Sequence, residues 1–356
     1  MRFVFCLVLL FLSFKVTFAN PNPTAGPNCH ILNAAISKND GKKYKIINRN
    51  LITSASVPEA IIFKNKTLLY YVNGDFDHHS IFVSEVSKDG KSTSVIGPIK
   101  LDGEIIKDAV DPDLIITREG KLRLFYYVGL FTKPVEGKKP NKIYSAISDD
   151  GLNFKIEGPV VSLDGGSDPT AIRLTNGSFL LAVPQADKLN IQLYNSPDGK
   201  NFSKLTSLRG GIPELALSNN GIPELLFQDA GGFVQYTSLN NGKTWKKTSK
   251  NVLTGYPASA ASPTIIRITE KERKMFFFKI KKNCTTPPTA YLEDKNSLKK
   301  LADKSREKPP LGDGVKPPTG GNAKGKPPLG DGVKPHAGGN ATGKPPLGHG
   351  VKLRKK

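Results

Sequence analysis

The sequence predicts an all-β protein: a five-bladed β-propeller followed by a disordered basic tail rich in proline and glycine. A strand that opens with proline, a tight polar turn and a second strand recur five times, with prolines at 58, 112, 169, 213 and 263. Spacings of 44 to 57 residues are typical of propeller blades. A separate repeat of 18 residues occupies the C-terminal part of the chain.

Residues 1–19 are predicted to be a secretory signal peptide. Arg2 precedes an apolar run over residues 3–14, and Thr17 and Ala19 are the small residues expected before a cleavage site. The run is too short to span a bilayer, which needs about 20 apolar residues. We therefore expect a secreted, extracellular protein without a membrane span, for which nucleic acid is not an expected partner despite a net charge of +21.

The cysteines and glycosylation motifs agree with an extracellular chain. Cys6 lies in the predicted signal peptide, so Cys29 and Cys284 remain, and an oxidising compartment favours one disulfide between them. That bond would hold the first and last strands of the propeller together. Glycosylation is predicted at five Asn-x-Ser/Thr motifs: Asn65, Asn176, Asn201, Asn283 and Asn340.

Composition divides the mature chain into three regions. Residues 20–290 form the predicted propeller, residues 291–307 a basic linker and residues 308–356 the tail. The run Lys308-Pro-Pro-Leu-Gly-Asp-Gly-Val-Lys316 recurs from Lys326 and again from Lys344, where His349 replaces the aspartate. From residue 295 onward 15 Lys and Arg stand against 4 Asp and Glu. The tail has too few large apolar side chains to offset the entropy cost of ordering, so it is expected to be disordered.

Each proline-led hairpin is followed by further strands and a second kind of polar turn. Three such turns share one plan, a Ser followed by Asp or Asn, Gly and an aromatic residue, within residues 144–154, 194–202 and 236–245, and residues 86–90 are a weaker copy. They resemble the Asp-box turn of sialidase-like propellers. An Asp or Asn side chain accepts backbone amides, Gly adopts positive φ and the aromatic residue fixes the hairpin to the core. A structural clip is favoured over a role in glycan handling.

The innermost strand of a propeller blade lines the central channel, where ligands bind. The residues that precede the five prolines are Val57, Asp111, Asp168, Ile212 and Ser262, and those that follow are Glu59, Asp113, Thr170, Glu214 and Thr264. Residues two apart share a face of a strand. We therefore expect Glu59, Asp111, Asp113, Asp168 and Glu214 to face the axis and contact a ligand. The alternative for Asp111 and Asp168 is that each caps the turn before its own strand.

The Asp-Pro start followed by Leu-Phe-Tyr, as in residues 111–126, resembles the five-bladed glycoside hydrolases of the arabinanase, xylosidase and fructosidase type, over about residues 45–283. That family uses an Asp base or nucleophile, a pKa-tuning Asp and a Glu acid. The resemblance assigns these roles to Asp111, Asp168 and, two residues beyond the matching Ile212, Glu214. Val57 stands where the first blade would carry Asp. The set is incomplete, so a degenerate binding site is favoured over a working hydrolase, and no cofactor is expected.

Two other acidic motifs are weighed as sites. The family's Glu-Gly-Pro string occurs at Glu157-Gly-Pro159, where a surface crossing between blades is expected. Asp75-Phe-Asp-His-His79 offers two carboxylates and two imidazoles, which could bind a metal. A solvated hairpin tip is the more frequent form of such a cluster, so no metal site is predicted.

The layout of signal peptide, propeller-like body and Lys-Pro-Pro-Leu-Gly-Asp-Gly-Val-Lys repeats resembles the avirulence-protein effectors of root-knot nematodes, which carry plant peptide-hormone-like motifs in their tails. The repeats depart from that hormone pattern, since no Arg begins a unit and no His or Asn run ends it. The expected function is a secreted, monomeric effector or binding protein. Its expected partners are a glycan or a host extracellular protein or receptor, with acidic polysaccharide as a further partner of the basic tail. The alternative is an active glycoside hydrolase on plant-type polysaccharide.

Overall fold

The computed structural model describes residues 26–74, 79–130, 133–134, 140–185, 188–229, 231–257, 259–282 and Cys284. All of these belong to the first of two units of the chain, Met1–Lys308 and Pro309–Lys356. The predicted signal peptide, linker and repeat tail lie outside the described residues, as do Asp75, Asp77, His78, Asn283 and Asn340. Among the described residues no helix is long and apolar enough to cross a membrane.

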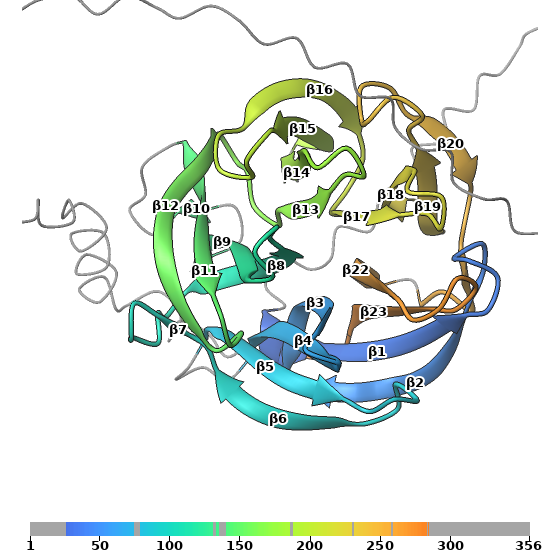
Figure 1. Cartoon of the computed structure of the whole chain (residues 1–356). Coiled ribbons are helices and arrows are strands. Elements are labelled where there is room, and N and C mark those ends of the chain that lie inside the picture. Colours follow the sequence, from blue (N-terminus) through green and yellow to red (C-terminus); the bar gives the residue numbers. More distant parts are fainter. Residues whose placement is uncertain are drawn as a thin grey trace, which may run out of the picture. The chain divides into compact units, whose positions relative to one another are not determined.

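The described fold is a five-bladed β-propeller, as the sequence predicts. Five mainly antiparallel sheets are arranged around a common axis (Figure 1). In each sheet the proline-led strand lies nearest to the axis. One short 3-10 helix, η1 (Pro27–Cys29), precedes the first strand.

Blades 1 to 4 each follow the chain from the innermost strand outward. Blade 1 consists of β3 (Ala55–Phe63), β4 (Lys66–Asn73), β5 (Ile81–Val86) and β6 (Thr93–Pro98). Blade 2 consists of β8 (Ala109–Ile116), β9 (Leu122–Leu130), β11 (Asn141–Ser148) and β12 (Asn153–Leu163), with β7 (Lys100–Leu101) and β10 (Lys133–Pro134) added at its margins. Blade 3 consists of β13 (Thr170–Arg173), β14 (Phe179–Gln185), β15 (Asn190–Ser196) and β16 (Ser203–Arg209). Blade 4 consists of β17 (Pro213–Leu217), β18 (Pro223–Asp229), β19 (Gly232–Thr237) and β20 (Lys246–Ser249).

Blade 5 is built from both ends of the propeller sequence. Its inner strands are β22 (Ala260–Arg267) and β23 (Arg273–Ile280), and its outer strands are β1 (His30–Ser37) and β2 (Tyr44–Thr53). Strand β1 pairs with β23 over its whole length, from His30 opposite Ile280 to Ser37 opposite Arg273. The short β21 (Leu253–Thr254) pairs in parallel with the start of β2. Because the N-terminal strand β1 pairs with the C-terminal strand β23, neither strand is left as an unpaired edge where the ring closes.

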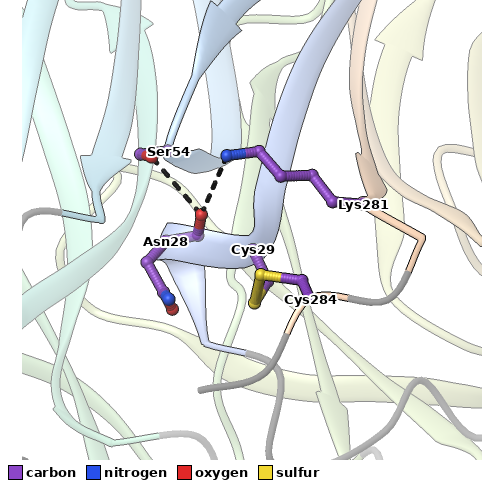
Figure 2. The surroundings of a disulfide bond; sticks show 5 residues. All are labelled: Asn28, Cys29, Ser54, Lys281 and Cys284. Carbon is purple, nitrogen blue, oxygen red and sulfur yellow. Dashed lines mark hydrogen bonds between the residues drawn. A yellow bond between two sulfur atoms is a disulfide. The ribbon is translucent and has the colours of Figure 1, made fainter. Parts of the chain in front are cut away.

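The predicted disulfide between Cys29 and Cys284 is confirmed. It joins Cα atoms 5.6 Å apart and 255 residues apart in sequence, directly beside the β1–β23 pairing. Figure 2 shows that the carbonyl of Asn28 accepts hydrogen bonds from Ser54 Oγ and Lys281 Nζ, each at 3.3 Å. The bond and these contacts hold the end of β23 against the start of β1. The disulfide is compatible with an extracellular protein.

The outer polar turns share one hydrogen-bond pattern. In blade 2, Ser148 Oγ accepts the amide of Gly151 at 2.9 Å, and Asp150 Oδ1 accepts the amides of Leu152 and Asn153, each at 2.8 Å. The same plan recurs at Ser196 to Gly199 in blade 3 and Ser238 to Gly242 in blade 4.

Blade 5 has such a turn that sequence analysis missed. Gly41 donates its amide to Ser37 Oγ at 3.0 Å, and Lys43 donates its amide to Asn39 Oδ1 at 3.1 Å. The turn was missed because it lies before the first proline-led strand in sequence but belongs to the last blade.

In blades 2 and 3 the aromatic residue after the turn packs on the preceding blade. Phe154 of blade 2 meets Tyr70 of blade 1 edge to face, with ring centroids 6.5 Å apart, and Tyr70 donates its hydroxyl to the carbonyl of Gly151 at 2.8 Å. Phe202 of blade 3 meets Phe125 of blade 2 in the same way at 5.9 Å. Such edge-to-face pairs stabilise beyond their buried area. In blades 2 and 3 this aromatic residue therefore contacts the neighbouring blade, while the likeness to an Asp-box turn stays a prediction.

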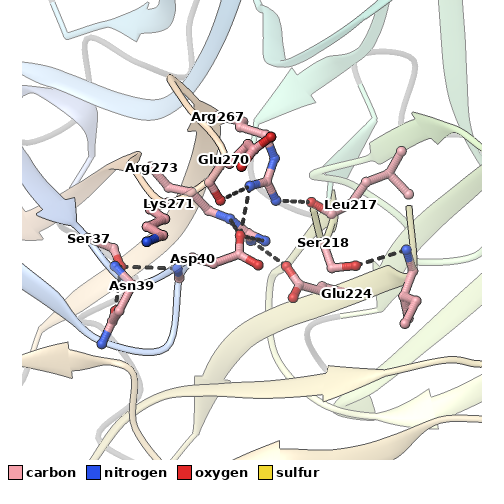
Figure 3. A network of polar contacts seen from close by, with 12 residues as sticks. Ser37, Asn39, Asp40, Leu217, Ser218, Glu224, Arg267, Glu270, Lys271 and Arg273 are labelled. Atoms are coloured by element: carbon pink, nitrogen blue, oxygen red, sulfur yellow. Dashed lines mark hydrogen bonds and ion pairs between the residues drawn. The ribbon is translucent and has the colours of Figure 1, made fainter. Parts of the chain in front are cut away.

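A buried ion-pair network joins blade 5 to blade 4. Arg273, 1% exposed, pairs with Asp40 at 2.6 Å and with Glu224 of β18, and Arg267 pairs with Asp40 at 2.7 Å (Figure 3). Arg267 also donates to the carbonyl of Leu217 at 3.0 Å. Burial opposes ionisation of Asp40, but hydrogen bonds from both arginines outweigh it and hold its pKa below the usual value.

Three of the predicted glycosylation motifs lie in described, exposed turns. Asn65 lies between β3 and β4, Asn176 between β13 and β14, and Asn201 between β15 and β16. The proline-led strands run from the axis end that carries their prolines toward these turns, and the third strand of a blade runs the same way. All three asparagines therefore lie at the end of the blades away from the prolines. Glycosylation at these positions remains a prediction.

We expect loss of the disulfide to destabilise the propeller. Replacing Cys29 and Cys284 together by Ser removes a link that closes 255 residues of chain, and the expected cost is about 2–5 kcal/mol of unfolding free energy. Urea denaturation followed by tryptophan fluorescence measures it. As a control, reductant should lower the midpoint of the unmodified protein and leave the double variant unchanged. Equal midpoints for the two oxidised proteins would contradict the clasp.

Candidate functional site

The inner strands begin with an irregular proline segment. The residue before the proline has a left-handed backbone in four blades, with φ between 42° and 54° at Val57, Asp168, Ser262 and Asp111. The register of three inner strands shifts there, for example between Val110 and Asp113. Positive φ is unfavourable for a β-branched residue such as Val57. Strain of this kind is held in place by surrounding structure and is concentrated near functional sites.

The residues after the prolines form a closed ring of hydrogen bonds, which we call the post-proline ring. It consists of Glu59, Asp113, Thr170, Glu214 and Thr264, one from each blade. Each side chain accepts the backbone amide that follows the equivalent residue of the next blade. The inner strand is the edge of its sheet, so these amides have no strand partner and need another acceptor. The ring therefore joins all five blades at the axis.

Five contacts complete the ring. The amide of Leu114 bonds to Glu59, and the amide of Ala171 donates to Asp113 Oδ2 at 2.9 Å. The amide of Leu215 donates to Thr170 Oγ1 at 3.0 Å, that of Ile265 to Glu214 Oε1 at 2.9 Å and that of Ala60 to Thr264 Oγ1 at 3.2 Å. The two threonine hydroxyls donate in turn to Glu214 Oε2 at 3.2 Å and Glu59 Oε2 at 2.8 Å.

Three carboxyl groups of the ring lie close together. One oxygen from each of Glu59, Asp113 and Glu214 lies within 4.8 Å of the others, and all three residues are buried. Oxygen donors in this number suit a hard cation, so these residues are the ones that could hold a metal ion among the described residues. Each carboxyl already accepts a backbone amide, which gives the cluster a structural role without an ion.

Burial raises the pKa values of the three carboxyls. For Glu59 and Glu214 desolvation is the largest cause, followed by the charge of Asp113, and both pKa values lie well above the usual one. Desolvation raises the pKa of Asp113 to about 8, against the opposing effect of the Ala171 amide. The ring therefore disfavours the ionised form of these carboxyls.

Asp111 and Asp168 form a second carboxyl pair. Asp111 Oδ2 accepts the amide of Asp168 at 3.2 Å, and Ser167 donates its hydroxyl to Asp168 Oδ2 at 2.8 Å. Burial, and then the charge of Asp168, raise the pKa of Asp111 well above its usual value, and burial raises the pKa of Asp168 to about 6. Burial, and then the charges of Asp111 and Asp168, raise the pKa of Tyr127, whose buried hydroxyl has no hydrogen-bond partner among the described residues.

A small cavity lies at the proline end of the axis. Its volume is about 20 Å³, which is room for about one water molecule. The five prolines line it together with Val57, Glu59, Asp113, Asp168, Thr170, Ile212, Glu214 and Ser262. The hydroxyl of Ser262 is buried and has no hydrogen-bond partner among the described residues. Asp111 is not among the lining residues.

Four of the five predicted ligand residues, Glu59, Asp113, Asp168 and Glu214, line this cavity. Asp111 is not among the lining residues, but its Oδ2 accepts the amide of Asp168 at 3.2 Å. A ligand role for these residues stays a prediction. Glu157 lies in β12, where it pairs with Arg123 at 2.8 Å, and so belongs to an outer strand instead of a surface crossing.

The His and Asp cluster is described only at His79. That residue is 5% exposed and lies with Nδ1 3.8 Å from Asp108 Oδ1, so a solvated tip is wrong at this position. Burial, with a smaller effect of Lys107, lowers the pKa of His79 to about 4.

Sequence reasoning missed the acceptor role of the ring residues. Thr170 and Thr264 complete the ring although only the acidic members were proposed as ligands. The available signal was the polar residue after every one of the five prolines, a regularity across all blades that indicates a shared structural task.

No protein-family model matches the chain, and no curated protein matches it. Solved structures with a similar fold include glycoside hydrolases. A family 117 enzyme of Zobellia galactanivorans is 14% identical over 73% of this chain and 94% of its own, with a TM-score of 0.47. A GH32 β-fructofuranosidase of Bombyx mori is 17% identical over 64% and 55%, with a TM-score of 0.49, and a GH43 β-1,3-galactosidase is 13% identical over 62% and 89%, with a TM-score of 0.46. These likenesses concern the fold alone.

We expect Asp113→Asn to change how stability depends on pH. Because the pKa of Asp113 rises from 3.8 to about 8 in the folded protein, the native state binds the extra proton between these values. Its contribution to stability is present below pH 3.8 and is lost as pH rises through about 8. Asparagine still accepts the Ala171 amide but carries no charge. The variant should therefore melt at a higher temperature than the parent at pH 8, by about 2–4 °C for each kcal/mol by which its free energy of unfolding rises.

Melting temperatures from pH 4 to 9 measure this effect, with Asp149→Asn as the control because Asp149 is exposed on the surface. The control should follow the parent curve. Parallel curves for Asp113→Asn and the parent would show that no buried charge is relieved at the ring.

Proposed function

We propose that the chain is a secreted binding protein for host interaction, in which the propeller is the recognition platform and the tail presents repeated ligand-like or adhesive motifs. The predicted signal peptide, the disulfide and the three tail repeats support this proposal. Its partner would be a glycan or a host extracellular protein at the proline end of the axis.

The binding role rests on one observation: the carboxyls of the post-proline ring are enclosed and already engaged in hydrogen bonds. A cavity of about 20 Å³ does not admit a sugar ring. Both oxygens of Glu214 are engaged, Oε1 by the Ile265 amide and Oε2 by Thr170. A general acid needs a carboxyl that reaches the leaving oxygen, with a second carboxylate across the bond. These contacts favour a degenerate site.

The alternative is an active glycoside hydrolase that uses Asp111, Asp168 and Glu214. It is favoured by Asp168, which lines the cavity with its pKa raised to about 6. A carboxyl with a pKa near neutrality suits general acid–base catalysis.

We expect the purified full chain to bind polysaccharide without cleaving it. Reducing-sugar release from arabinan, xylan and fructan should stay at the level of Asp111→Ala and Asp168→Ala variants, and binding is measured on the same polymers by affinity electrophoresis. Turnover that either substitution abolishes would establish the hydrolase instead. If the chain neither cleaves nor binds these polymers and does not bind extracellular host protein, the proposed recognition platform is contradicted.

We expect removal of residues 308–356 to abolish a host response that depends on the repeats. Root tissue would be treated with the full chain, the truncated chain and a chain with residues 308–356 in scrambled order, and the oxidative burst measured. The scrambled tail keeps composition and charge, so it separates a ligand-like motif from an adhesive one. A full response to the truncated chain would contradict any role of the tail in signalling.

A further inference from the structure

The outer surface between blades 4 and 5 is a continuous feature, which we call the seam. It comprises residues 42–50, around β2, and residues 243–255, around β20 and β21. Parallel pairing of Tyr44 with Leu253 and of Lys45 with Thr254 joins β2 to β21, the short strand that follows β20. Lys43 Nζ donates to the carbonyl of Asn251 at 2.7 Å, and the guanidinium of Arg49 lies against Gly255.

Exposed cations are concentrated along the seam. They are Lys42, Lys43, Lys45, Arg49, Lys243, Lys246, Lys247 and Lys250. Among the described residues only Lys247 of this set has a carboxylate within ion-pair distance, Asp229 at 3.4 Å. Asp40, the acidic residue nearest to Lys42 in sequence, is neutralised by Arg267 and Arg273. The seam therefore presents a nearly uncompensated positive surface.

The other outer strands carry fewer cations than the seam. The outer strand of blade 3, Ser203–Arg209, carries two, Lys204 and Arg209. The outer strand of blade 1, Thr93–Pro98, has no charged residue. The outer strand of blade 2 carries Lys155 and also Glu157, whose carboxylate pairs with Arg123 and Lys200. Of the eight cations of the seam, four lie in β2 and β20 and four in the adjoining segments, which is more than any other outer strand carries.

We propose that the seam binds a linear anionic polysaccharide. Exposed cations on neighbouring extended strands form a stripe along which a chain of carboxylate or sulfate groups can lie, and displacement of counterions drives such binding. The inference rests on the extracellular location in the proposed function, where acidic polysaccharide is the available linear polyanion. It places this partner on the folded propeller, at a surface separate from the axial cavity and from the tail.

Charge reversal at three seam positions tests the proposal in the full chain. Lys45→Glu, Lys246→Glu and Lys250→Glu alter exposed side chains without a hydrogen bond or ion pair among the described residues. Lys142→Glu, Lys155→Glu and Lys204→Glu on blades 2 and 3 form the matched control, because these lysines are also exposed and the net charge changes equally. Binding to immobilised polygalacturonate and heparin is measured over 50–300 mM salt, beside neutral xylan.

The seam variant should bind on the order of tenfold more weakly than the parent and show a shallower salt dependence, while the control changes by less than about threefold. Equal weakening of both variants, or of neither, would overturn the proposal, because the tail or net charge would then account for binding. Stronger binding to duplex DNA or anionic vesicles than to the polysaccharides would also overturn it. Binding to neutral xylan is measured separately, so failure of the proposed platform leaves the seam result interpretable.

Discussion

The structure depends on how the innermost strands satisfy their backbone amides. Each inner strand is the edge of a sheet, and the five edges meet at an axis where there is little room for water. A carboxylate or hydroxyl from the neighbouring blade accepts the exposed amide in every case. The proline before each acceptor removes one further donor. This arrangement links the blades in a closed circuit, and it also places ionisable groups where their ionised forms are unfavourable.

Two sets of contacts hold neighbouring blades together, the post-proline ring at the axis and the aromatic residues after the outer polar turns. At the axis the contacts are hydrogen bonds, whereas toward the periphery aromatic residues after the polar turns pack on the preceding blade, as Phe154 does on Tyr70. Between blades 4 and 5 the buried Arg273 adds ion pairs to Asp40 and Glu224. The contact between blades 4 and 5 thus has an electrostatic component, and within blade 5 the disulfide joins the two ends of the propeller sequence.

Much of the fold could be predicted because each blade repeats a local pattern. The proline, the polar turn and the apolar second strand identify all five inner hairpins, and two mature cysteines leave one pairing. The site was harder to predict from the sequence. A left-handed residue precedes the proline in four blades, and strand alternation does not anticipate this backbone conformation. Whether a carboxyl faces a ligand or a neighbouring amide depends on inter-blade geometry, which no single blade's sequence contains.

The composition of blade 5 has a consequence for how the protein folds. Its outer strands are made first during synthesis and its inner strands last, so β1 and β2 wait for residues more than 200 positions away. Contacts of such sequence separation slow folding because loop-closure entropy is spent before they form. The first four blades can assemble as the chain emerges, while the second edge of β1, which already pairs with β2, stays open until β23 arrives. Ring closure is then the final, slow step, and the exposed edge of β1 is the place where premature association between chains would begin.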